Sequence, residues 1–157
     1  MKNLKLALTA AAALAVSTPF VAQAQSSYDE QQQLIAQIQT DKRAIVLKAM
    51  ALDDAQLTAF TSIYDKYQAD RKLLMQRGAD LLNAFASNYD SMTDDAAKGL
   101  LTDWFKLQDD EVKLIRDTAK KLDKVLPTTK VLRFVQVENK LNTLLRLPAL
   151  QGIPLAQ

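Results

Sequence analysis

The chain has 157 residues, of which 20 are Lys or Arg and 18 are Asp or Glu, and it contains neither histidine nor cysteine. Ser-His and Cys-His nucleophiles, thiol redox chemistry, disulfides and metal sites built from imidazole or thiolate are therefore excluded. The length fits one modest domain, and the nearly balanced charge argues against a nucleic-acid partner, which would require a net basic surface.

The first 24 residues are typical of a cleavable signal peptide. Lys2 and Lys5 form a basic head, residues 6–16 are apolar but too few to span a bilayer, and Ala22-Gln23-Ala24 has the small-x-small pattern of a cleavage site. We therefore predict removal of residues 1–24 and a periplasmic mature chain without a transmembrane anchor. Without the two signal lysines the chain is formally neutral, but residues 113–157 are strongly basic.

The mature sequence favours long helices, because no proline occurs between Ser26 and Pro127 and β-branched clusters are few. The segment Ser27-Tyr28-Asp29-Glu30 has the pattern of a capping box and predicts the start of the first helix, which should end near Met50. The next start signal is sharper. Asp53 is expected to cap the second helix and Gln56 to be its reciprocal partner, while Leu52 and Leu57 occupy the positions of a hydrophobic staple.

Apolar residues at alternating steps of three and four predict two long central helices. The second helix should run from Leu57 past Phe85, with a bend at Gly78, and Thr93 should cap the third helix. In the third helix the same spacing predicts an inward seam, widened by Leu100, Leu107 and Leu114. The seam consists of Ala97, Leu101, Trp104, Gln108, Val112, Ile115, Ala119, Leu122 and Leu126.

Two prolines are predicted to end the last two helices. Pro127 should end the third, and Pro148 should stop a fourth that begins near Thr128, leaving residues 148–157 as an extended apolar tail. The prediction is an all-α fold with four mature helices in a single domain, residues 25–147, whose two long central helices form an elongated bent hairpin. Because helices of roughly 45 Å would leave part of their apolar seam exposed, a homodimer is expected.

The acidic groups are interpreted as caps and solvated faces. Asp53-Asp54, Asp94-Asp95 and Asp109-Asp110-Glu111 are adjacent in sequence, and neighbouring residues of a helix point about 100° apart, so none has the geometry of a paired carboxylate site. We therefore expect no catalytic, cofactor-binding or metal-binding residue and no enzyme activity. A hydrolase that uses carboxylates alone is the least favoured alternative.

Two further groups of residues allow two interpretations each. Lys113, Arg116, Lys120 and Lys124 form one basic stripe, which is either a solvated helix face or a rim around a surface that binds client proteins. The aromatic residues at seam positions are interpreted as core, and the alternative is that the tyrosines line an exposed groove. These aromatic residues are Phe60, Tyr64, Tyr67, Trp104 and Phe134.

The segment Leu52-Asp53-Asp54-Ala55-Gln56 at the start of a long helix resembles the LTXXQ family of periplasmic proteins, the Spy-like and CpxP-like proteins. Leu52, Ala55 and Gln56 match the motif, and Asp53 replaces the threonine while keeping its capping role. At the place of the family's second copy, residues 126–130 keep the leucine but have proline and lysine for threonine and glutamine. The resemblance implies small helical dimers that act as ATP-independent chaperones or stress modulators. Zinc binding, which some relatives achieve with histidines, is not carried over.

We therefore expect an exported, chaperone-like or envelope-stress protein that binds unfolded or partner polypeptides through an apolar surface edged with charge. The alternative is a dedicated periplasmic adaptor or modulator of a sensor protein, with one specific partner and no general chaperone activity.

Overall fold

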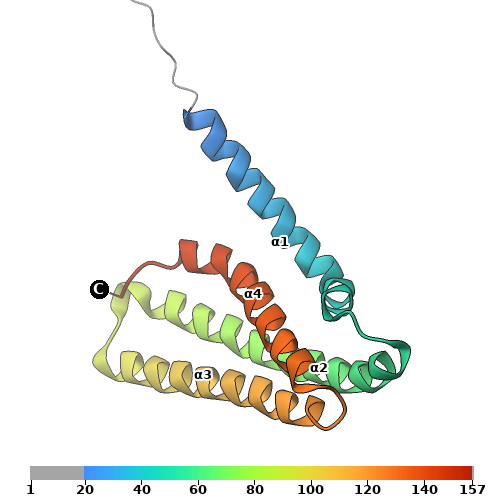
Figure 1. Cartoon of the computed structure of the whole chain (residues 1–157). Coiled ribbons are helices and arrows are strands. Elements are labelled where there is room, and N and C mark those ends of the chain that lie inside the picture. The colour runs from blue at the N-terminus through green and yellow to red at the C-terminus, as the bar shows by residue number, and fades with distance from the viewer. Residues whose placement is uncertain (1–19, 157) are drawn as a thin grey trace, which may run out of the picture. The chain divides into compact units, whose positions relative to one another are not determined.

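The computed structural model describes residues 20–156, which contain helices and no β-strand (Figure 1). The helices are α1 (Phe20–Met50), α2 (Asp54–Asn88), the short 3-10 helix η1 (Tyr89–Ser91), α3 (Asp94–Leu122) and α4 (Thr128–Gly152). The chain divides into two units, residues 1–34 and residues 35–157. The described part of the first unit is the beginning of α1, and the core, the groove and the cavities described below belong to the second. The prediction of an all-α fold is confirmed.

The two central helices, α2 and α3, pack against each other as a hairpin, as predicted (Figure 1). Both predicted caps are present, since the Asp53 carboxylate accepts from the Gln56 backbone N–H at 2.8 Å and the Thr93 hydroxyl accepts from the Ala96 N–H at 3.2 Å. Helix α2 continues through Gly78, where a β-carbon would lie 3.5 Å from Leu107 Cδ2. The glycine thus lies where α3 approaches α2, and it does not end the helix.

The predicted start of the first helix at Ser27 is wrong, because α1 is already helical from Phe20. The segment before Ser27 is rich in Ala and Gln, which favour helix, so Ser27 lies inside the helix rather than at its free N-terminal N–H groups. Residues 1–19 of the predicted signal peptide lie outside the described residues. Further along, α1 is kinked at Asp41, whose φ of −117° and ψ of 17° are not helical.

The predicted stop at Pro148 is also wrong. Helix α4 includes Pro148 and ends at Gly152, so the extended segment begins at Ile153. A proline removes one backbone N–H and crowds the carbonyl four residues earlier, which weakens a helix near its end without forcing the chain out of it. We call residues 153–156 the tail.

The main core lies at the base of the hairpin, where α1, α2, the end of α3 and α4 meet. Phe134 of α4 is at its centre, because its ring packs edge-on against Phe60, Tyr64 and Tyr67 of α2 at centroid distances of 5.4 to 6.3 Å. Four of the five aromatic residues predicted as core are therefore buried here, whereas the prediction for Trp104 is wrong, since it is 40% exposed on α3. The buried cluster consists of Ile38, Val46, Met50, Phe60, Tyr64, Tyr67, Leu122, Leu126, Val131, Phe134 and Leu141.

Lys130, in the first turn of α4, contacts the turn between α1 and α2 at this base. Its ammonium donates to the backbone carbonyls of Met50, at 3.1 Å, and Ala51, at 2.6 Å, which are the last carbonyls of α1 and its cap. A cation at the C-terminal end of a helix satisfies free carbonyls and complements the helix dipole. Lys130 stands where the resemblance places a glutamine, so the departure from the motif provides a cap for α1.

The predicted inward seam of α3 is only partly correct. Leu107 and Leu122 are buried and Leu100 is half-buried, whereas Leu101 and Val112 of the predicted seam are 56% and 51% exposed. Helix α3 has more apolar width than a single neighbour can cover, and along its first half that neighbour is α2. One apolar stripe therefore faces α2 and the adjacent one faces solvent.

Ala51 has a left-handed backbone conformation, with φ at 48°, at the C-terminal end of α1. A β-carbon is strained there and glycine is not. We expect Ala51→Gly to raise the free energy of unfolding by about 0.5–1 kcal/mol, measured by urea denaturation. The matched control is Ala49→Gly inside α1, which should lower it by about 1 kcal/mol. A loss of stability in both variants would contradict the left-handed cap.

Candidate functional site

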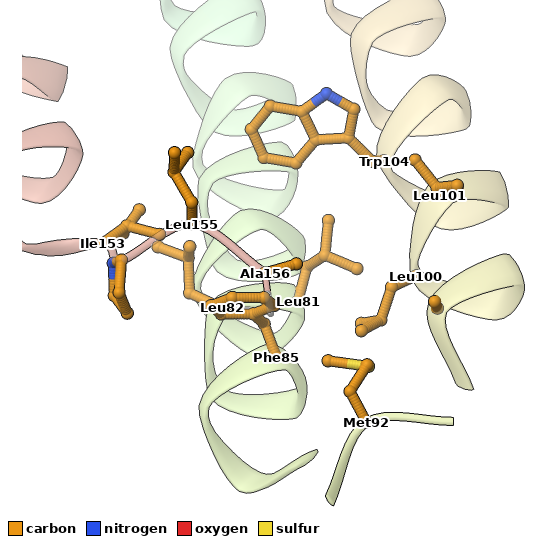
Figure 2. A pocket seen from close by; sticks show the side chains of 12 residues that line it. Leu81, Leu82, Phe85, Met92, Leu100, Leu101, Trp104, Ile153, Leu155 and Ala156 are labelled. Carbon is orange, nitrogen blue, oxygen red and sulfur yellow. The ribbon is translucent and has the colours of Figure 1, made fainter. Parts of the chain in front are cut away.

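A groove with an apolar lining lies at the tip of the hairpin, between the end of α2 and the beginning of α3, and encloses about 630 Å³ (Figure 2). We call it the apolar groove. The tail of the chain borders it, and Met92 of the connection between the two helices lies at one end. Its lining consists of Leu81, Leu82, Phe85, Met92, Ala97, Leu100, Leu101, Trp104, Ile153, Pro154, Leu155 and Ala156.

Helical spacing positions the two walls of the groove. Leu81 and Phe85 are one turn apart on α2, and Leu100 and Trp104 are one turn apart on α3, so each pair projects from one side of its helix. Figure 2 shows these side chains on either side of a hollow, with Trp104 and Leu101 coming from α3. No residue is buried in α2 beyond Arg71 or in α3 before Leu107, so the tip remains accessible.

The tail borders the groove without closing it. Residues 153–156 are not helical, Ile153 has an extended backbone, and Leu155 is 89% exposed although it lines the groove. Trp104 is 40% exposed and Leu101 is 56% exposed, so both keep free surface on the opposite wall. The open apolar surface can accept further apolar side chains.

The chemistry of the groove is that of a binding surface. Its lining side chains are aliphatic, aromatic or thioether groups, and the Trp104 indole N–H is the only strong hydrogen-bond donor among them. Such a surface gains free energy from burial of apolar area and imposes little orientation on what it binds. It therefore suits apolar segments of varied sequence.

Of the predicted rim residues, Lys113, Arg116 and Lys120 are exposed on α3 and Lys124 is exposed in the turn that follows it, and none lines the apolar groove. Lys120 forms a loose ion pair with Asp117 at 3.7 Å. Arg116 and Lys120 follow Val112 at four-residue steps, and Leu101, Phe105 and Val112 are the exposed apolar residues earlier on the same face. The structure thus places the basic stripe as a continuation of an exposed apolar stripe along α3, beyond the groove.

A buried polar cluster around Glu138 is the feature that the sequence did not reveal. The Glu138 carboxylate is fully buried and accepts hydrogen bonds from Lys42 of α1 at 2.8 Å and from Tyr67 of α2 at 2.9 Å. Weaker contacts of 3.3 to 3.4 Å come from Tyr64, Gln68 and Asn142. These donors compensate the charge of a carboxylate that has left water.

The cluster changes how its members titrate. Burial, together with the charge of Glu138 and hydrogen bonding to it, raises the pKa of the Tyr64 and Tyr67 hydroxyls far above its ordinary value. Burial lowers the pKa of Lys42, although the attraction of Glu138 opposes this. The two tyrosines therefore stay protonated and continue to donate to the carboxylate at alkaline pH.

The acidic groups at Asp109-Asp110-Glu111 have structural partners. Asp110 pairs with Arg77 of α2 at 2.7 Å, and this hydrogen bond holds the pKa of Asp110 below its usual value. Glu111 pairs with Arg146 of α4. In residues 20–156 we find no group of three or more acidic side chains arranged to hold a metal ion, and no helix that combines the length and hydrophobicity of a membrane span.

Comparisons with known protein families, with curated proteins and with solved structures find no match to this chain.

The sequence signals for these surfaces differ in strength. In α3 the residues Leu100 and Leu107 stand one position before the seam residues Leu101 and Gln108, so the apolar face is wider than one neighbouring helix can cover. This width could have predicted an exposed stripe. For Glu138 no local signal exists, because Lys42 and Tyr67 are 96 and 71 residues away.

Tyr67→Phe tests the polar cluster. At neutral pH it removes a hydrogen bond to a buried charge, so we expect the free energy of unfolding to fall by about 1.5–3 kcal/mol. The raised pKa of the two tyrosines also makes the free energy of unfolding depend on pH. Above pH about 10 the unfolded tyrosines ionise while the folded ones do not, so stability falls with rising pH by up to about 1.4 kcal/mol per pH unit for each tyrosine.

Because Tyr67→Phe removes one of these groups, its stability should fall less steeply with pH between about 10 and 11 than that of the unmodified chain. Urea denaturation at a series of pH values measures this, and Tyr64→Phe should reduce the steepness in the same direction. An unchanged steepness in both variants would show that the hydroxyls titrate normally in the folded protein.

Proposed function

We propose that this chain is an exported, ATP-independent, chaperone-like protein that binds exposed apolar segments of unfolded polypeptides in the apolar groove. The observation that carries the proposal is the open, predominantly apolar lining of the groove at a hairpin tip that has no buried core of its own. An exposed apolar surface of this kind on a folded domain is typical of an interaction site. The signal-peptide pattern supports a periplasmic location, and the resemblance to the LTXXQ family supports the class of function.

The tail indicates what the groove accepts. Ile153-Pro154-Leu155-Ala156 is an extended apolar segment of polypeptide that borders the groove, and it buries little of itself there. An unfolded client offers the same chemistry, with more apolar side chains in reach of Trp104 and Leu101. The basic stripe of α3 would speed the encounter with acidic clients rather than form part of the groove.

A homodimer belongs to the same proposal. Phe105 and Val112 are 60% and 51% exposed on α3 and lie outside the groove, so a second copy packed on this stripe would cover apolar surface without occupying the groove.

Suppression of client aggregation, followed by light scattering, tests the groove. The unmodified chain at several-fold excess should suppress the aggregation of chemically unrelated unfolded clients without ATP. Leu101→Ser and Trp104→Ser each remove an exposed apolar contact worth about 1.5–3 kcal/mol, so each should weaken client binding by about tenfold or more.

The matched control is Leu73→Ser. Leu73 is 66% exposed on α2 but does not line the groove, so this variant should suppress aggregation as well as the unmodified chain. No suppression by the unmodified chain, or equal loss in Leu73→Ser, would refute the groove as the client site.

The alternative is an adaptor or sensor modulator with one partner protein, and the ordered apolar-to-basic stripe on α3 favours it. Affinity capture from periplasmic extract distinguishes the two functions. A chaperone should retain many proteins below equal stoichiometry, with the Leu101→Ser variant losing them. One partner at equal stoichiometry, lost in Arg116→Ser and kept in Leu101→Ser, would establish the adaptor instead.

A further inference from the structure

Arg71 is a buried cation without a protein counterion. Arg71 lies on α2 and is only 7% exposed, and its Nε has no hydrogen-bond partner. Among the described residues no carboxylate lies within ion-pair distance of it. A buried guanidinium in this state is strongly unfavourable unless an anion accompanies it.

The two carboxylates of this region are engaged elsewhere. Glu138 takes Lys42 as its ion-pair partner, and Glu111 takes Arg146. Each of these pairs is formally neutral, so the charge of Arg71 remains in excess. No carboxylate among the described residues pairs with Arg71, so an anion that enters the cavity would balance its charge.

Arg71 lines a cavity of about 180 Å³ between α2, α3 and α4, separate from the apolar groove. Asn139 and Thr143 of α4 add polar groups to one side of it. On the other side α3 contributes Val112 and Ile115, with Val112 51% exposed, and also Glu111, whose carboxylate is paired with Arg146. The cavity thus joins the Arg71 cation and the hydrogen-bonding groups of α4 to the apolar side chains of Val112 and Ile115, with the neutral Glu111–Arg146 pair beside them.

We propose that this cavity binds a small aliphatic carboxylate, with the carboxylate on the Arg71 guanidinium and the alkyl group against Val112 and Ile115. A guanidinium binds a carboxylate through two parallel hydrogen bonds, which matches the planar group available here. The apolar wall distinguishes such a ligand from an inorganic oxyanion. The carboxylate belongs either to a free short-chain acid or to the C-terminus of a polypeptide ending in an aliphatic residue.

The site is separate from the apolar groove, because the two share no lining residue, although Val112 belongs both to this cavity and to the stripe proposed for the homodimer. Isothermal titration with n-butyrate, and the unfolding midpoint in about 10 mM butyrate against the same concentration of chloride, measure binding directly. Butyrate should bind and raise the midpoint. Arg71→Met should weaken binding by about tenfold or more and lose the shift.

The Arg71→Met variant also separates a ligand site from a structural role. If Arg71 serves a ligand, the variant without butyrate should be at least as stable as the unmodified chain, because an apolar side chain replaces an unpaired buried charge. Arg77→Met is the matched control, since Arg77 lies on the same helix, pairs with Asp110 and does not line this cavity. It should keep the full response to butyrate.

Further titrations identify the chemical class of the ligand and its source. Inorganic phosphate should give a clearly smaller shift than butyrate, and an equal shift would overturn the aliphatic carboxylate. A dipeptide Ala-Leu that binds, while its C-terminally amidated form does not, supports the polypeptide source; binding of butyrate alone supports the free acid. Absence of binding by every carboxylate, or an unchanged response in Arg71→Met, would overturn the site.

Discussion

The buried carboxylate of Glu138 is the constraint on which the arrangement of the helices depends. Apolar packing around Phe134 stabilises the base of the hairpin but has little directionality, and long helices with apolar stripes can slide or rotate against one another with small cost. A buried charge allows no such freedom, because it must meet donors at hydrogen-bond distance. Lys42 and Tyr67 meet it from α1 and α2, so the setting of α4 against both helices is fixed.

The tip of the hairpin has the opposite character. Helices α2 and α3 continue well beyond the core, and there each has chiefly the other as a neighbour. One helix face can be covered by this single contact, and the additional apolar residues of α3 remain at the surface. The apolar groove follows from this mismatch between the length of the helices and the extent of the core. A well-packed base can stabilise such a tip because the base does not depend on it.

Local chemistry made much of the fold predictable. The caps at Asp53 and Thr93 were correct because a cap is decided within four residues. The errors at Ser27 and Pro148 have a common cause. A capping pattern or a proline changes the free energy of a helix locally, but the neighbouring sequence decides whether the helix continues. The face of α3 that turns inward, and the burial of Glu138, depend on helices far away in sequence. Such features cannot be read from periodicity alone.

Helix α4 takes part in the base and in the Arg71 cavity, but not in the apolar groove. Its first turn carries Lys130, which caps α1; Glu138 lies in its buried middle; and Arg146 lines the Arg71 cavity. The tail at the groove begins only after the helix has ended at Gly152. The tail lies beyond the helix and beyond every ion pair of the base, so under the proposed function a client would displace it without breaking a helical hydrogen bond or exposing Glu138. Such an exchange would cost only the loose contacts of a few residues, which is compatible with the proposed reversible binding that needs no external energy.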